Sequence, residues 1–287
     1  MSQTRSQMGA QTGTPPGADT GTWPAGPPSA FADDAPHRQG AISLPNPTGA
    51  QVPPGVRIYA VGDIHGRFDL LRELQSAIDA DLAARPADRP IEVYLGDYVD
   101  RGPRSAQVIE ALIARRNERE VICLAGNHEA MMLDALDEDA AMVRWLGVGG
   151  VAAALSYFGD DLMSAPMQPE MVRDALNAAL PQAHRAFLCG LYSSFVCGDY
   201  LFVHAGLRPG VPLEQQSEHD LIWIRQDFLD CTTPFEKIVV HGHTPVASVE
   251  CRPNRIAIDT GAFATGRLSC LRLEGASREV LATGRFD

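Results

Sequence analysis

After residue 55, short apolar runs alternate with amphipathic stretches. The runs at 56–61, 91–95 and 120–124 are mostly apolar, which is typical of buried strands. Between them, residues 69–84 and 105–116 place apolar side chains at helical spacing. Strands that alternate with helices in this way predict a parallel sheet with right-handed crossovers.

The second half of the chain has a different pattern. Residues 140–190 are mostly helical in pattern, with breaks at 147–150 and 166–169. Beyond them lie further strand-like runs, at 200–203, 237–240, 255–258, 268–273 and 279–282. We expect these runs to form a second sheet that packs on the first, with helices outside, in an α/β fold.

The N-terminal segment differs from both halves. Residues 1–55 hold about half of the 21 prolines, many small polar residues and almost no hydrophobic periodicity. Such a segment buries too little apolar surface to offset the entropy of ordering. We expect a disordered tail over 1–55 and a catalytic domain over 56–287.

Composition excludes some classes of function. The net charge is −12 and no Lys/Arg-rich stretch is present, which argues against a nucleic-acid partner. The six cysteines form no Cys-x-x-Cys pair, as expected in a reducing compartment. No apolar run approaches the roughly 18 residues of a membrane span, and the N-terminus lacks an apolar signal-peptide core. These features predict a cytoplasmic protein without a membrane partner.

Candidate chemistry lies in glycine-rich turns that follow the predicted strands. The turns Gly62–Gly66, Gly96–Gly102 and Gly126–Glu129 contain Asp, His and Asn residues, and a helix is expected to begin near Ala130. Two histidine blocks, at 204–206 and 241–244, follow downstream. Ligands of a parallel sheet bind beyond the carboxyl ends of its strands, where the first three turns fall.

These residue types suit two divalent cations. Imidazole and carboxylate groups together bind Mn²⁺, Fe²⁺ and Zn²⁺, and a pair of such ions needs a bridging carboxylate. Asp63 and His65 can point at one ion, and Asp97 is the natural bridge. The remaining candidates, for the second ion, are Asn127, His204 and His243.

Other polar residues fit roles in phosphoester hydrolysis. His128 follows Asn127 directly but should point differently, so it is the candidate general acid, with Asp100 fixing its tautomer. Arg101 and Arg225 are candidates for gripping phosphate oxygens. His241 is expected to lie outside the ligand set, as a structural group or as a support for a ligand.

These blocks resemble those of the phosphoprotein phosphatase family of calcineurin-like metallophosphoesterases, in its bacterial and phage form. The resemblance covers residues 56 to about 275 and implies a central β-sandwich flanked by helices. It also implies a two-metal centre, with manganese the expected ion, and the ligand, acid and clamp roles described above. Arg225 is the weakest of these transfers, because it rests only on the sequence around Leu221–Arg225.

Sequence differences from the eukaryotic enzymes limit which substrates and partners are expected. Ala125 replaces their arginine before the Gly-Asn-His-Glu block, and Ile258–Ala262 stands near the end in place of their substrate-loop motif. Regulatory subunits of the eukaryotic kind are therefore not expected. Asp100 and Glu129 are features that symmetrical diadenosine-tetraphosphate hydrolases tend to lack.

The sequence therefore predicts a phosphomonoesterase acting on phosphorylated protein. A metal hydroxide would attack phosphorus in line, a chemistry that does not dictate Ser, Thr or Tyr as the substrate residue. Two alternatives remain open, a nucleotide hydrolase and a phosphate-binding module without catalysis.

Overall fold

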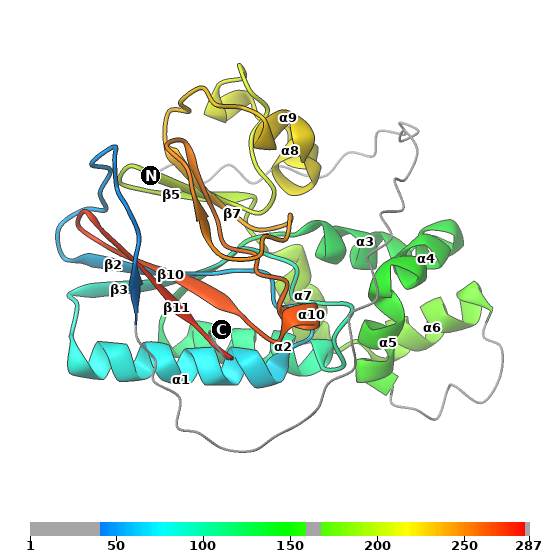
Figure 1. Cartoon of the computed structure of the whole chain (residues 1–287). Helices are drawn as coiled ribbons and strands as arrows, with labels where there is room; N and C mark the ends of the chain where they lie inside the picture. Colours follow the sequence, from blue (N-terminus) through cyan, green and yellow to red (C-terminus); the bar gives the residue numbers. More distant parts are fainter. Residues whose placement is uncertain (1–40, 159–167, 285–287) are drawn as a thin grey trace. The chain divides into compact units, whose positions relative to one another are not determined.

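A six-stranded sheet, in the order β1-β11-β10-β2-β3-β4, holds the first part of the predicted site. The structure is a computed structural model that describes residues 41–158 and 168–284 (Figure 1). Three parallel strands lie on one side of this sheet: β2 (Val56–Val61), β3 (Arg89–Tyr94) and β4 (Glu120–Cys123). They are connected by α1 (Phe68–Ala84) and α2 (Ser105–Glu118), which confirms the expected crossovers.

A second sheet of five strands has the order β5-β6-β7-β9-β8. Its strands are β5 (Ser194–Cys197), β6 (Tyr200–Val203), β7 (Ile238–His241), β8 (Glu250–Cys251) and β9 (Arg255–Ala257). Of these, β6, β7 and β9 run parallel. Figure 1 shows α1 and α2 beneath the first sheet, and α8 (Glu218–Trp223) and α9 (Gln226–Leu229) above the second.

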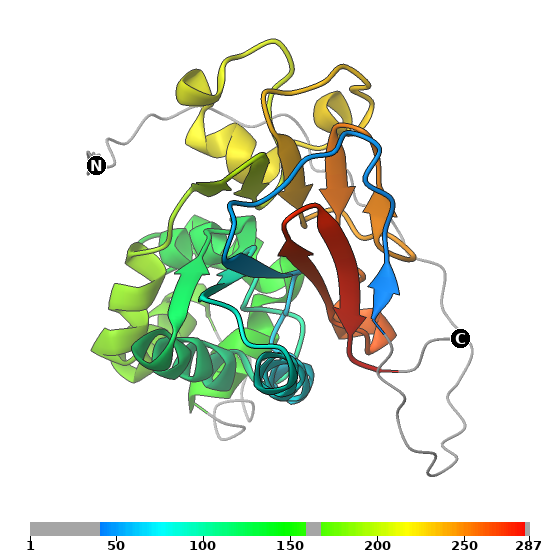
Figure 2. The same cartoon turned by 90° about the vertical axis from the view of Figure 1, so that its left-hand side faces the viewer.

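Alternation of side chains along the strands builds three apolar layers. Ile58 on β2 and Phe202 on β6 belong to the cluster between the two sheets. Tyr59, the neighbour of Ile58, packs instead among the side chains of α1 and α2. Val203, the neighbour of Phe202, packs against α8 and α9. The expected β-sandwich flanked by helices is therefore present (Figure 2).

Two strands assigned to the second sheet in fact complete the first. The hairpin of β10 (Ser269–Glu274) and β11 (Ser277–Ala282) pairs antiparallel with β2 through β10. The sequence of this hairpin fits either sheet, because a strand of either sheet buries one of its faces in the layer between them. Leu271 and Leu273 supply the inter-sheet cluster from this position.

The folded domain also begins before the expected boundary at residue 56. β1 (Ile42–Ser43) pairs antiparallel with β11, and Ala50 and Val52 are buried in the inter-sheet cluster. These few apolar residues lacked a periodic pattern of their own, because they close the edge of a sheet built by distant segments. Residues 1–40 of the expected tail lie outside the described residues.

The helices between β4 and β5 form a lobe beside the site. They are α3 (Asn127–Ala135), α4 (Asp139–Trp145), the π-turn η1 (Leu146–Gly150), α5 (Val151–Phe158), α6 (Pro169–Ala179) and α7 (Gln182–Cys189). The continuous stretch Asp139–Phe158 is long and apolar enough to cross a membrane by composition alone, contrary to the expectation for this chain, although one such helix is weak evidence. Its Met142, Trp145 and Ala153 pack in the main core.

Candidate metal centre

The predicted ligands lie in turns at the carboxyl ends of strands from both sheets. Asp63 and Asp97 follow β2 and β3, and His204 directly follows β6. Asn127 opens α3 instead of preceding it, so the helix begins three residues before its expected start near Ala130. The first turn of α3 therefore presents both Asn127 and His128 to the site.

Backbone conformation marks the same residues. In the described part of the chain, the non-glycine residues with positive φ are His65, Asp97, Asp100, Arg101 and His243. All of them are predicted site residues. Such conformations cost free energy and persist only where the surrounding structure enforces them, as happens at functional sites.

Two glycines allow the turns to approach the ligands closely. A Cβ atom on Gly126 would overlap the Asp97 carboxylate, and one on Gly242 would overlap the Asp63 carboxylate. Glycine removes that obstacle at both positions. Gly126 lies in one of the glycine-rich turns that the sequence predicted for the site, whereas the close approach at Gly242 was not predicted.

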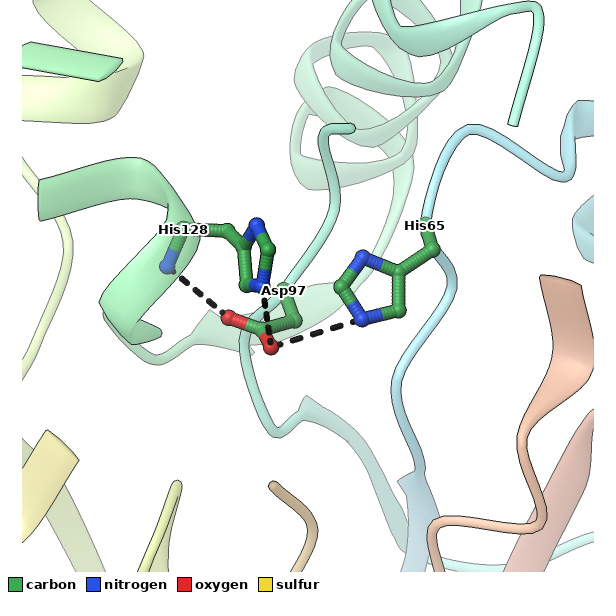
Figure 3. A group of neighbouring side chains, drawn as sticks. All are labelled: His65, Asp97 and His128. Atoms are coloured by element: carbon green, nitrogen blue, oxygen red, sulfur yellow. Dashed lines mark hydrogen bonds and ion pairs between the residues drawn. The ribbon is translucent and has the colours of Figure 1, made fainter. Parts of the chain in front are cut away.

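The carboxylate of Asp97 faces two different groups of ligands. Its Oδ2 lies 3.5 Å from Nε2 of His65, and its Oδ1 lies 3.3 Å from Nε2 of His204. Figure 3 shows Asp97 between His65 and His128. Two clusters of potential ligand atoms share this carboxylate, one with His65 and His128 and the other with His204 and His243.

Hydrogen bonds determine which ring nitrogen points into the site. Nδ1 of His65 lies 2.9 Å from the Val99 carbonyl, and Nδ1 of His204 lies 2.9 Å from the Leu95 carbonyl. A carbonyl only accepts, so each Nδ1 carries the proton and each Nε2 presents a lone pair. Burial lowers the pKa of His65 to about 3 and also lowers the pKa of His204, which keeps both rings neutral.

Lone pairs therefore converge without a proton between them. Nε2 of His204 lies 3.0 Å from Oδ1 of Asn127 and 3.3 Å from Oδ1 of Asp97. In the same region, Oδ1 of Asp63 and Nε2 of His243 are buried and have no hydrogen-bond partner among the described residues. Because buried polar atoms need a partner, this donor set fits divalent cations.

Buried negative charge points to the same conclusion. Burial raises the pKa of Asp63 well above its usual range, and the charges of Asp259 and Asp97 raise it further. Burial also raises the pKa of Asp259 to about 6. Cations at the site would offset this cost. Asp259 was not predicted as part of the site, because its Asp-Thr-Gly context is also that of an ordinary turn.

His128 and Asp100 form the expected pair. Nδ1 of His128 lies 2.6 Å from Oδ2 of Asp100, so Nδ1 donates and Nε2 faces the site. Burial alone would lower the pKa of His128, but Asp97 and Asp100 outweigh it and raise that pKa. Both side chains are almost fully buried.

The two arginines predicted to grip phosphate lie at different ligand clusters, Arg101 at that of His65 and Arg225 at that of His243. The guanidinium of Arg101 lies 2.9 Å from Nε2 of His65 and 3.1 Å from Nε2 of His128. It also lies over the ring of Phe263, at 4.7 Å from the ring centroid. Arg225 donates to the carbonyl of His243 at 3.3 Å. Each guanidinium therefore contacts one of the two groups of predicted ligands.

Glu129 has a role that its motif did not reveal. Its two carboxylate oxygens accept hydrogen bonds from the backbone N–H groups of Asp97, Tyr98, Val99 and Gly126. The buried carboxylate thus holds the Gly96–Gly102 turn against the start of α3. The Ser/Thr/Gly-x-x-Glu spacing of a helix-capping motif was the available signal.

Two other histidines lie away from the ligands. His241 is fully buried, contacts the ring of Phe228 edge-on, and has a pKa lowered to about 3 by burial. These contacts agree with the structural alternative for His241. His184 is also buried, with its ring nitrogens near Tyr157 Oη and Glu110 Oε2.

Comparison with known proteins gives consistent matches. The profile of the calcineurin-like phosphoesterase family matches residues 56–266. Serine/threonine-protein phosphatase 2 of Escherichia coli K12 is 27% identical over 225 residues, covering 76% of this chain and 93% of that protein. The asymmetrical bis(5'-nucleosyl)-tetraphosphatase PrpE of Anoxybacillus flavithermus is 24% identical over 232 residues, covering 74% of this chain and 88% of that protein.

The fold is shared with a solved structure. The crystal structure of a candidate diadenosine tetraphosphatase superposes with a TM-score of 0.52 at 23% identity. The match covers 85% of this chain and 97% of that one.

Proposed function

The chain belongs to the calcineurin-like phosphoesterase family, and on this premise we propose that it is a protein phosphatase of the bacterial and phage type. Its substrates are phosphorylated Ser and Thr side chains of proteins. The observation that carries the proposal is the 2.6 Å contact between His128 and Asp100 beside the two ligand clusters.

The chemistry of the leaving group explains why this pair matters. A Ser or Thr alkoxide is strongly basic and leaves slowly unless it receives a proton. A nucleotide leaving group is far less basic and needs no such help. His128, with Nδ1 held by Asp100 and Nε2 facing the site, is placed to deliver that proton. An acid pair of this kind supports hydrolysis of phosphoserine and phosphothreonine.

Other residues divide the remaining work. Asp63, His65 and Asp97 would hold one divalent ion, and Asp97, Asn127, His204 and His243 would hold the second. Such ions, when bound, would supply a nucleophile from water near neutral pH and would neutralise charge on the phosphoryl oxygens. Manganese suits this mixture of imidazole, carboxylate and amide ligands. Arg101 and Arg225 orient the phosphate, since a guanidinium matches its oxygens in pairs.

A nucleotide hydrolase is the second candidate. The similarity to PrpE, an asymmetrical enzyme and not a symmetrical one, covers almost the same share of this chain as the similarity to the Escherichia coli phosphatase. Identity does not separate the two candidates, at 27% and 24%. The acid pair supports the protein phosphatase, whereas Glu129 argues only against a symmetrical hydrolase.

The setting of the enzyme forms part of the proposal. We propose a cytoplasmic enzyme without a stable nucleic-acid partner, a membrane partner or a eukaryotic-type regulatory subunit. The support is the net charge of −12 and the six cysteines, all of which are unpaired within the described residues. We keep the proposal of a disordered tail only for residues 1–40.

The deciding experiment compares substrates directly. kcat/KM of the Mn²⁺-loaded protein is measured on phosphoserine, phosphothreonine and phosphotyrosine peptides and on symmetrical and asymmetrical cleavage of diadenosine tetraphosphate. We expect the phosphoserine and phosphothreonine peptides to be preferred. Preference for the dinucleotide would overturn the proposal in favour of the second candidate. Bound metal without turnover of any of them would indicate a phosphate-binding module.

A further inference from the structure

We propose that Trp145 and the kinked turn that follows it (Leu146–Gly150) position two parts of the catalytic site, the acid pair and the phosphate-binding Arg101. Trp145 ends α4 and orients the acid pair through Asp100, while Gly149 in the turn fixes Arg101. The inference rests on the proposed roles of His128 and Arg101. It does not depend on which phosphoester is the natural substrate.

The contact between Trp145 and Asp100 is symmetrical. The indole Nε1 lies 2.9 Å from both carboxylate oxygens of Asp100, and both side chains are fully buried. One of these oxygens is also the partner of His128. An N–H donor that is shared by both oxygens fixes the plane of the carboxylate, and the carboxylate in turn fixes the imidazole of His128.

The indole is itself held in place. A Cβ atom on Gly150 would overlap the indole ring, so the ring lies flat against a backbone that has no side chain there. Asp100 is anchored on its other side, where its backbone N–H donates to Ser105 Oγ at 3.0 Å. The indole ring and the Asp100 backbone are therefore each held by a second contact, which favours a fixed donor over simple core packing.

Gly149, the residue before Gly150, contacts the predicted phosphate-binding residue Arg101. The carbonyl of Gly149 accepts a hydrogen bond from the backbone N–H of Arg101 at 3.1 Å. Gly149 has φ +118°, and a Cβ on it would lie 2.8 Å from Cγ of Arg101. Arg101 also has a positive φ, of 64°, so its backbone needs external support.

Trp145→Phe separates positioning from packing, because it keeps an aromatic ring and removes the N–H group. We expect kcat on phenyl phosphate, which has a poor leaving group, to fall about tenfold, with little change on p-nitrophenyl phosphate. KM and metal content should stay constant. A role limited to packing would lower both rates equally or leave both unchanged. Trp223→Phe is the matched control for loss of an indole N–H, since Trp223 stacks on His219, which belongs to neither ligand cluster.

Gly149→Ala tests the other contact. We expect KM for both aryl phosphates to rise about tenfold, with the same dependence of kcat on the leaving group as in the unaltered protein. A steeper dependence on the leaving group would contradict the division between the two contacts.

A measurement without turnover completes the test. The sequence has only three tryptophans, so the indole N–H resonance of Trp145 can be assigned by its loss in Trp145→Phe. In Asp100→Asn we expect this resonance to shift upfield while that of Trp223 stays in place. An unshifted Trp145 resonance would overturn the inference. Because aryl phosphates and the resonance report on the site alone, inactivity on phosphopeptides would refute the proposed function and leave this inference intact.

Discussion

The Glu129 carboxylate accepts a hydrogen bond from the Asp97 backbone N–H at 2.8 Å. Asp97 is the residue shared by both ligand clusters, and its φ of 50° is one that a non-glycine residue rarely adopts. A buried carboxylate thus maintains the backbone on which the centre depends.

We predict that Glu129→Gln destabilises the fold and the metal centre together. The amide nitrogen cannot accept, so two of the backbone N–H groups lose their buried partner. The free energy of unfolding should fall by about 2–4 kcal/mol, measured by urea denaturation of the metal-free protein. Glu138→Gln, at an exposed position, is the control and should have little effect. Equal stability of the two variants would contradict the role of Glu129.

Asp97→Asn should abolish binding of the metal pair. An amide offers one neutral oxygen where the carboxylate presents an oxygen to each cluster, His65 on one side and His204 on the other. Elemental analysis after dialysis should show fewer than two ions per chain. Asp137→Asn, at an exposed position, should retain both. Two ions retained in Asp97→Asn would disprove the shared-ligand assignment.

Removal of the metal should lower thermal stability. Asp63 Oδ1 and His243 Nε2 are buried without a partner in the described protein, and a bound cation would satisfy them. For each site, Mn²⁺ at about 100 times its dissociation constant should raise the free energy of unfolding by about 3 kcal/mol over the chelated protein. Calorimetry with and without EDTA measures the change. A similar rise in Asp97→Asn would place the stabilising ion elsewhere.

His128→Asn should slow catalysis without loss of metal. The variant lacks the proton donor that Asp100 holds at 2.6 Å. We expect kcat on phosphoserine peptide to fall by about 10²–10⁴. Metal content provides the control. If it falls as well, His128 is a ligand, as its place in the cluster with His65 and Asp97 would also allow.

A buried ion pair behind the sheet should contribute strongly to stability. Glu92 on β3 is 1% exposed and lies 2.6 Å from Nη2 of Arg115 on α2. Arg115→Met removes the nearest charged partner of this carboxylate, leaving, among the described residues, only Arg119 at 3.8 Å, and should cost about 3–5 kcal/mol. The double variant with Glu92→Leu should recover much of that loss. Arg119→Met, at a half-exposed position, should cost less than about 1 kcal/mol. Equal losses in the two single variants would contradict this account.

Local patterns were sufficient for the three parallel strands of the first sheet. β2, β3 and β4 and their connecting helices lie close to the predicted runs, because a buried strand and an amphipathic helix each have a characteristic period. The same logic failed for β10 and β11, since a half-buried strand looks alike in either sheet. It also failed for β1, which pairs with a strand more than 200 residues away, and for Val52, which is buried in the cluster between the two sheets.

The amino-acid sequence by itself determined which residues are available as ligands, acid and clamp, because each stands in a short motif with a local chemical logic. Only the tertiary structure decided how they meet. The Leu95 carbonyl selects the tautomer of His204, which lies 109 residues further along the chain. Trp145 donates to Asp100, which lies 45 residues before it. Glu129 also accepts from the N–H groups of Asp97, Tyr98 and Val99, which no local pattern assigns to it. Such contacts arise from packing of distant segments, and packing is a property of the whole fold.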